Sequence, residues 1–485
     1  MIHSSLTRYL SLVEDPSGFL ASLARSLPVC VWTNTLKTSP RQLEQVLEHQ
    51  NLEWEAIAWY PGAYRIFDWD KPGKTIPFIC GWYTVQEEIA LAAVRALAPD
   101  PGDRVLDLCA SPGGKTAQLS LAVGFNGMVM ANERSIGRLA ALSTTITRLG
   151  LINVMTSGYD GRTFAAPSHS FDRVLVDVPC SGEGTIRKKA GRQSLEQENW
   201  RPTHSQRLVS IQRQLLDRAL RLVKPGGIVV YSTCTFAPEE NEAVIDGVVG
   251  DRGVLEPYAI AGLEYAPGLL EWEGQSFRAD CGHAHRYWPH LNNTGGFFVA
   301  RIRRTDRDLM SDTALDQGIN RSPKTHNSPT TLQRVRNQQS MMWMSDRFGI
   351  DPEHLEIYNC WSTGQEKEWL ASPACIPPAN VTLNTIGIPF VRHTPHGFKP
   401  TTAALQRLGT HVKRQHIDLT LEQGQLFVAG EAQQGSNITQ WHPEWHPNKN
   451  TQGFIHVRSG PYELGCGRWR HQHLYCELPK TLRLA

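Results

Sequence analysis

The sequence lacks any apolar run long enough to cross a bilayer, and its first residues lack the basic segment followed by an apolar one that directs export. We therefore expect a cytoplasmic protein without a membrane partner. None of the ten cysteines forms the C-x-x-C pairs that structural zinc favours, so we expect free thiols and no metal site. The formal net charge is only +2, so any surface that binds anions must be local.

With 485 residues the chain is too long for one hydrophobic core, and we expect several domains. In residues 1–80, clustered tryptophans and tyrosines form either a core stripe, the more common outcome, or a platform for stacking RNA bases. Residues 304–330 are polar and predict a linker. Residues 331–485 contain short strand-like runs at 426–430 and 453–458, which predict a small β-rich domain.

Residues 81–303 alternate apolar runs with helical patterns, which predicts an α/β fold with a doubly wound, Rossmann-like parallel sheet. A β-branched run after Pro225 leads to Cys234, and residues 295–302 predict a closing strand that could be antiparallel. The other predicted strands lie at 104–109, 128–133, 153–156 and 171–177, and the predicted helices at 85–97, 116–123, 135–149 and 205–223.

A loop of small residues follows the first strand of this sheet and opens a helix, so a ligand can approach its backbone amides. It matches neither the Walker spacing nor G-x-G-x-x-G. Glu133 ends the second strand, where an acid typically grips a ribose, and Asp160 after the third strand could accept from an adenine amine. Each acid alone is more often a cap or a solvated turn residue, but three loops at one rim favour a nucleoside-containing cofactor. The loop consists of Cys109, Ala110, Ser111, Pro112, Gly113, Gly114 and Lys115.

An acid and two thiols follow the next two strands: Asp177 and Cys180 after the fourth, and Cys234 after the fifth. A single free cysteine is more often a buried core residue than a catalyst. Beside a nucleoside cofactor, however, this set suits methylation at C5 of a pyrimidine. A thiolate adds to C6 while an acid engages N3, and C5 then becomes nucleophilic. A simple N- or O-methyltransferase needs neither cysteine.

Three segments, 106–116, 177–182 and 231–236, together with Glu240-Asn241-Glu242, resemble the motifs of the Nol/Nop/Sun family of S-adenosylmethionine-dependent RNA cytosine-C5 methyltransferases. The resemblance covers roughly residues 30 to 302. It implies that the loop from Cys109 to Lys115 lines the methionine part of S-adenosylmethionine.

The same resemblance implies roles for the remaining residues of the site. Glu133 would hold the ribose, with Arg138 on the helix that follows it, and Asp160 the adenine end. Asp177 would contact the target cytosine beside the cofactor. Cys234 would be the nucleophile, and Cys180 would promote release of the product. The residues themselves do not rank the two cysteines, because DNA cytosine methyltransferases use a Pro-Cys nucleophile.

Five further residues are candidates for RNA binding. The family usually has Arg-Val-Asn-Thr-Leu-Lys near the N-terminus; this chain lacks that arginine but keeps Asn34 and Lys37. Arg187, Lys188 and Lys189 follow the Pro-Cys loop. Such a run is usually a solvated loop, but its neighbourhood favours contacts to phosphates.

The C-terminal region is similar to the tail of RsmF-like bacterial enzymes, which carry a PUA-like RNA-binding domain and act on 16S ribosomal RNA. The resemblance therefore implies ribosomal RNA or the small ribosomal subunit as the partner of a monomeric enzyme. A transfer RNA substrate is the alternative within the class. A non-catalytic RNA-binding factor of ribosome assembly is the alternative from another class.

Overall fold

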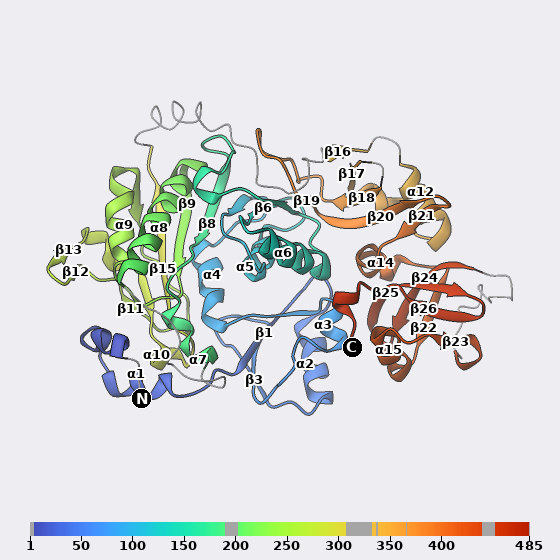
Figure 1. Ribbon diagram of the computed structural model, residues 1–485, viewed down its shortest axis with the longest axis horizontal. Helices are drawn as coiled ribbons and strands as arrows, with labels where there is room; N and C mark the ends of the chain where they lie inside the picture. Colours follow the sequence, from blue (N-terminus) through green and yellow to red (C-terminus); the bar gives the residue numbers. More distant parts are fainter. Residues whose placement is uncertain are drawn as a thin grey trace.

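The computed structural model describes residues 4–189, 202–306, 332–335, 338–364, 366–438 and 452–484. Figure 1 shows a central sheet with helices against it, an N-terminal part along its lower side and two smaller β-rich units at the C-terminal end.

The central sheet has ten strands in the order β11-β14-β15-β9-β8-β5-β6-β7-β19, with β10 also pairing to β15. The strands from β9 to β7 run parallel, which confirms the predicted Rossmann-like sheet. The closing strand β15 (Phe297–Arg304) is antiparallel to β9, as the sequence suggested. The parallel strands are β5 (Arg104–Asp107), β6 (Met128–Asn132), β7 (Val154–Ser157), β8 (Phe171–Asp177) and β9 (Val223–Thr233). The remaining strands are β10 (Gly253–Leu255), β11 (Ala266–Pro267), β14 (His285–Tyr287) and β19 (Thr385–Ile386).

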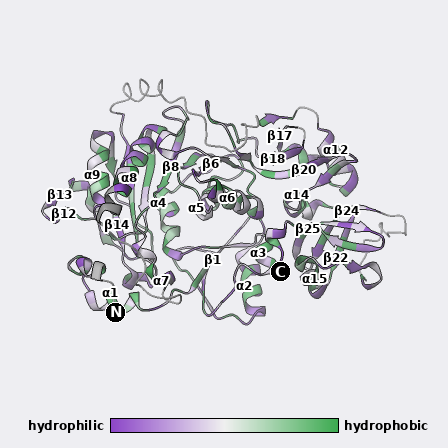
Figure 2. Ribbon diagram, in the orientation of Figure 1, coloured by the Kyte–Doolittle hydropathy of each residue, from purple (hydrophilic) through white to green (hydrophobic). Residues whose placement is uncertain are grey.

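Helices cover both faces of this sheet, and successive strand residues point to opposite cores. Val105 packs with one cluster and Leu106 with the other, so the strands read as continuous apolar runs. Figure 2 shows hydrophobic residues gathered along the central strands. One face carries α4 (Ala92–Leu97), α5 (Gly114–Val123) and α6 (Ile136–Leu149), and the other α8 (Pro202–Leu222) and α9 (Glu242–Val249).

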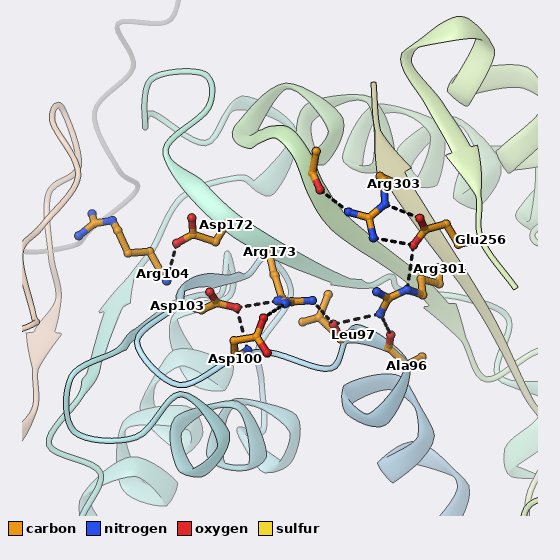
Figure 3. A network of polar contacts seen from close by, with 11 residues as sticks. Ala96, Leu97, Asp100, Asp103, Arg104, Asp172, Arg173, Glu256, Arg301 and Arg303 are labelled. Carbon is orange, nitrogen blue, oxygen red and sulfur yellow. Dashed lines mark hydrogen bonds and ion pairs between the residues drawn. The ribbon is translucent and has the colours of Figure 1, made fainter. Parts of the chain in front are cut away.

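A network of ion pairs ties together the edge of the sheet where the parallel strands begin (Figure 3). Arg173 donates from Nε to Asp103 Oδ2 at 2.6 Å and from Nη1 to the carbonyl of Leu97 at 2.9 Å. Nearby, Arg301 pairs with Glu256 at 3.2 Å. This edge is therefore occupied by mutually satisfied charges, and the opposite edge is available for a site.

The N-terminal part forms an antiparallel sheet in the order β2-β3-β1-β4. The sheet ends at Val85, past the predicted boundary at residue 80, because β4 pairs with β1. Trp59 and Tyr64 are buried in it, which favours the core interpretation of those aromatics. The strands are β1 (Val29–Thr33), β2 (Trp54–Ala56), β3 (Ala63–Ile66) and β4 (Tyr83–Val85); the helices are η1 (Ser4–Leu12), α1 (Pro16–Leu23), α2 (Pro40–His49), α3 (Ile76–Ile79) and η2 (Glu88–Leu91).

The C-terminal part contains two five-stranded sheets, in the orders β16-β17-β18-β20-β21 and β22-β24-β25-β26-β23. Its strand β19 joins the central sheet beside β7, so this part is not a detached unit. The first sheet contains β16 (Leu332–Arg334), β17 (Asn359–Thr363), β18 (Lys367–Ala371), β20 (Ile388–Thr394) and β21 (Gly397–Pro400). The second contains β22 (His416–Leu419), β23 (Gln433–Gln434), β24 (Gly453–Ser459), β25 (Tyr462–Arg470) and β26 (His473–Cys476). The main helices are α12 (Gln339–Phe348), α14 (Thr402–Leu408) and α15 (Leu421–Ala429).

Two predictions about this region need correction. The run at 426–430 is not a strand but the end of helix α15, because Thr420 and Gln423 form a capping box and Gly430 ends the helix. The linker cannot start at residue 304, since β15 runs through Arg304; most of the predicted linker lies outside the described residues. The strand predicted at 453–458 is confirmed as β24. Across the described ranges, no helix has the length and apolar character that a membrane crossing requires.

Candidate active site

Two thiols meet at the edge where the parallel strands end. Cys234 directly follows β9, and Cys180 lies in the loop after the neighbouring β8. Their Sγ atoms are 3.2 Å apart, and the backbone N–H of Cys234 donates to Cys180 Sγ at 3.3 Å. The parallel register of β8 and β9 sets this distance, because it pairs Asp177 with Ser232 just before the two loops.

The surroundings of the two thiols differ. The hydrogen bond from Cys180 lowers the pKa of Cys234, an effect that burial and the Asp177 charge oppose and that the Lys115 ammonium reinforces. The same hydrogen bond, together with burial, raises the pKa of Cys180 well above its ordinary value. When Cys234 is ionised, Cys180 is therefore placed to donate to it, and the thiolate is the nucleophilic form.

Asp177 ends β8 beside the thiols, and two donors hold its carboxylate. Lys115 Nζ donates to Oδ2 at 2.8 Å, and Ser232 Oγ donates to Oδ1 at 2.8 Å. Burial acts against the charged form of Lys115, but the Asp177 charge more than compensates and raises the pKa of the ammonium. The carboxylate is thus oriented at the same edge as Cys234.

The loop of small residues predicted to hold a cofactor lies next to this acid. Gly113 has φ +106° and precedes α5 without a side-chain cap, which leaves amides of the first turn to a ligand. A Cβ at Gly114 would lie 2.6 Å from Gln86 Oε1, so the backbone passes close to a neighbour here. A cavity of about 950 Å³ opens beside the loop; its lining includes Asp107, Cys109, Ala110, Ser111, Pro112, Gly114, Lys115, Asp177 and Lys188.

Asp107, at the end of β5, is a site residue that the sequence reasoning missed. Thr116 Oγ1 donates to its Oδ2 at 2.7 Å, whereas Oδ1 is buried without a hydrogen-bond partner among the described residues. Burial raises the pKa of this carboxyl group to about 7. An unsatisfied buried acceptor in a cavity wall fits a ligand with a donor such as an ammonium group. The signal was an aspartate inside an otherwise apolar buried strand.

The acids predicted to hold the nucleoside end lie at the same edge. Glu133 follows β6 and accepts from the backbone N–H of Ser135 at 2.8 Å. Arg138 donates to the carbonyl of Ser111 at 3.0 Å and so braces the cofactor loop. Hydrogen bonds from Arg162 lower the pKa of Asp160, which stays ionised next to a guanidinium group.

Asn34 and Lys37 were predicted to contact RNA, but the structure gives both side chains internal partners. The buried Asn34 amide donates to the carbonyls of Gly81 and Leu149 at 2.8 and 2.9 Å. Lys37 Nζ donates to the carbonyl of Gln406 at 2.9 Å, and burial lowers its pKa to about 7. Both residues therefore join parts of the fold, contrary to the prediction.

The basic residues after the Pro-Cys loop differ in their surroundings. Arg187 is buried and donates to the carbonyls of Arg25 and Thr294 at 2.9 and 2.8 Å, so it holds the fold together instead of meeting a phosphate. Lys188 is exposed and lines the cavity. The side chain of Lys189 lies outside the described residues.

Comparisons with known proteins agree with this geometry. Residues 94–303 match the model of the family described as 16S rRNA methyltransferase RsmB/F. The chain is 28% identical over 493 residues to ribosomal RNA small subunit methyltransferase F of Aliivibrio fischeri, which covers 99% of this chain and 96% of that one. It is 34% identical over 336 residues to 25S rRNA (cytosine-C(5))-methyltransferase nop2 of Schizosaccharomyces pombe, covering 67% of this chain and 54% of the relative.

The fold is shared with solved structures. A methyltransferase homologue from Pyrococcus horikoshii is 29% identical, with a TM-score of 0.52, and the match covers 62% of this chain and 95% of that one. The chain spans only about half of the length of the Schizosaccharomyces pombe relative. The part of the chain that carries the central sheet and both cysteine motifs, residues 94–303, is thus the part similar to the RsmB/F methyltransferase family.

Proposed function

We propose that this protein is an S-adenosylmethionine-dependent RNA (cytosine-C5)-methyltransferase that uses Cys234 as its nucleophile. The observation that carries the proposal is the pair of thiols 3.2 Å apart, beside an oriented carboxylate and a small-residue loop at one sheet edge. An enzyme that methylates nitrogen or oxygen has no use for such a pair.

The side chains divide the work as follows. The Cys234 thiolate forms a bond to C6 of the cytosine while Asp177, in its protonated form, donates its proton to N3, and the electrons of the C5–C6 double bond move to C5. C5 accepts the methyl group, and a base then removes the proton that C5 carries. The bond between Cys234 and C6 breaks, the double bond re-forms, and Cys180 promotes this release.

S-adenosylmethionine supplies an electrophilic methyl group when it is bound. The chain offers it the free amides at the start of α5 and the unsatisfied Oδ1 of Asp107, which suits the ammonium group of its methionine part. Glu133, with Arg138, would hold the ribose of the cofactor, and Asp160 its adenine end. The amides at the start of α5 would thus bind the carboxylate of the methionine part, and Asp107 its ammonium group.

For the substrate, we propose ribosomal RNA of the small subunit. Support comes from ribosomal RNA small subunit methyltransferase F of Aliivibrio fischeri, which matches nearly the whole chain. The C-terminal sheets then serve as a PUA-like RNA-binding part, and Lys188 at the cavity meets phosphates. We further propose that the protein acts on RNA in the cytoplasm as a monomer.

The test is methyl transfer from labelled S-adenosylmethionine to purified 16S ribosomal RNA, small subunits and transfer RNA. We expect label in the small-subunit RNA with the wild type and none with Cys234→Ala, which should also form no covalent adduct with RNA. Full transfer by Cys234→Ala would exclude the nucleophile assignment. Label only in transfer RNA would exclude the ribosomal substrate, and no binding of S-adenosylmethionine would leave a non-catalytic RNA-binding factor.

A further inference from the structure

A chain of hydroxyl and carboxyl groups runs behind the two thiols and begins in the N-terminal helix η1. Tyr9 OH donates to the Glu183 carboxylate at 2.9 and 3.0 Å. Thr235 Oγ1 donates to Glu183 Oε2 at 2.9 Å, and it lies 2.7 Å from Ser181 Oγ. Ser181 follows Cys180 and Thr235 follows Cys234, so the chain links the immediate neighbours of both thiols.

The direction of the hydrogen bonds in this chain is determined. An ionised Glu183 can only accept, so Tyr9 and Thr235 both donate to it. Thr235 has a single hydroxyl proton and therefore accepts from Ser181. Burial raises the pKa of Glu183, and the hydrogen bonds from Tyr9 and Thr235 act in the opposite direction. The carboxylate thus depends on these two donors to remain charged away from water.

The N-terminal helix is fixed against the loop that follows Cys234. Tyr9 has 0% exposure, and its ring lies 5.8 Å from that of Phe236. Phe236 in turn stacks on Trp288 at 5.1 Å. Next to Tyr9, Arg8 forms an ion pair with Glu239. The phenol is therefore presented to Glu183 by a packed element and not by a free end of the chain.

The two thiols depend on this chain to different degrees. Cys234 directly follows β9, whose ladders with β8 and β15 hold its backbone. Cys180 lies in a loop whose two ends, Val178 and Gly184, form backbone hydrogen bonds to Ser232 and Cys234. Next to Cys180 the loop is held through side chains: the backbone N–H of Ser181 donates to Glu240 at 3.0 Å, and Ser181 Oγ joins the chain to Tyr9. Loss of the chain should therefore displace Cys180 and leave Cys234 in place.

We infer that Tyr9 and Glu183 are positioning residues for the release step of the reaction: they hold the Cys180 loop so that its thiol stays against Cys234. This inference rests on the proposed function, because it assigns the two residues to one step of that chemistry. It adds the N-terminal helix to the working parts of the active site.

The experiment compares Tyr9→Phe with Tyr64→Phe in the full-length protein. Tyr64 is a matched control, since this buried tyrosine also donates through its hydroxyl to a glutamate, the partly exposed Glu44, at 3.0 Å, but in the N-terminal part away from the thiols. For Tyr9→Phe we expect steady-state methylation to fall about tenfold or more, as for the loss of one hydrogen bond to a charged group. Covalent enzyme–RNA adduct should accumulate on denaturing gels, while single-turnover methyl transfer changes less than about twofold when it is measured at alkaline pH, where Cys234 ionises without the hydrogen bond from Cys180. Tyr64→Phe should match the wild type in all three.

Other outcomes overturn the inference or the proposed function separately. If the wild type methylates RNA and Tyr9→Phe behaves like Tyr64→Phe, the inference is wrong and the proposed function stands. An equal loss of single-turnover and steady-state rates would mean a merely structural role. If the wild type transfers no methyl group to RNA, the proposed function is wrong, and the inference that rests on it is wrong as well. Glu183→Gln serves as a second variant should Tyr9→Phe not fold, and Glu183→Asp should restore part of the release rate.

Discussion

Replacement of Cys180 by alanine tests whether its thiol keeps Cys234 in the ionised form. The hydrogen bond between the Sγ atoms, 3.2 Å apart, is the largest cause of the lowered pKa of Cys234. A lower pKa means more thiolate at a given pH, so removal of the donor must raise the pKa. The acid limb of the rate of adduct formation should therefore move to higher pH.

The size of the effect follows from the kind of hydrogen bond. A bond to a charged acceptor contributes about 1.5–3 kcal/mol, and the weak S–H donor places this one near the lower end. About 1.5 kcal/mol corresponds to roughly tenfold in an equilibrium constant. Lys115 continues to favour the thiolate in the variant. We thus expect adduct formation by Cys180→Ala to be about tenfold slower near neutral pH and to approach the wild-type rate at alkaline pH.

The assay is single-turnover adduct formation with RNA over a range of pH. Cys180→Ser should stay close to the wild type, because its hydroxyl can still donate to Cys234. Cys375→Ala is a matched control, since this buried thiol lies in the C-terminal part and donates to the carbonyl of Ile152. An acid limb of Cys180→Ala that coincides with that of the wild type would refute the reasoning.

Two further predictions concern the cofactor loop and the opposite sheet edge. Burial raises the pKa of Asp107 to about 7, so the affinity for S-adenosylmethionine should weaken as the pH falls through 7 and the carboxylate takes up a proton. Calorimetry should show that Asp107→Asn loses this pH dependence. An unchanged pH dependence in the variant would contradict the role of Asp107 in binding the ammonium group. Arg173→Ala removes the guanidinium group that pairs with Asp103 in the network of Figure 3 and leaves that carboxylate only the backbone N–H of Asp100 as a donor. The substitution should lower the free energy of unfolding by about 3 kcal/mol, with unchanged activity of the folded protein. Denaturant titration measures this loss of stability, and Arg41→Ala is the control because it removes an exposed ion pair that contributes under about 1 kcal/mol. Equal losses of stability in the two variants would contradict the prediction.

The local sequence was sufficient for the central sheet and for the set of groups at its edge. Runs such as 104–109 and 171–177 are apolar on both faces, which only a covered parallel strand explains, and the closing antiparallel strand was also recognisable. Because parallel strands end at one edge, the order of the motifs was enough to bring Asp177, Cys180 and Cys234 together. The resemblance to known methyltransferases then ranked the thiols.

Other features depend on contacts between residues far apart in the chain. The short apolar run at 426–430 could not be told from a strand until its capping box was seen, and Asn34, Lys37 and Arg187 looked like free polar groups until their buried carbonyl partners were known.

Sequence alone therefore determined the fold class and the chemical groups of the site, since both follow from patterns within a few residues. Only the tertiary structure decided that the two thiols lie within hydrogen-bond distance, that Asp107 lines the cavity with an unsatisfied oxygen, and that Tyr9 reaches Glu183. The physical reason is that hydrogen bonding, burial and pKa depend on distances of a few ångströms, and the packing of distant segments sets those distances.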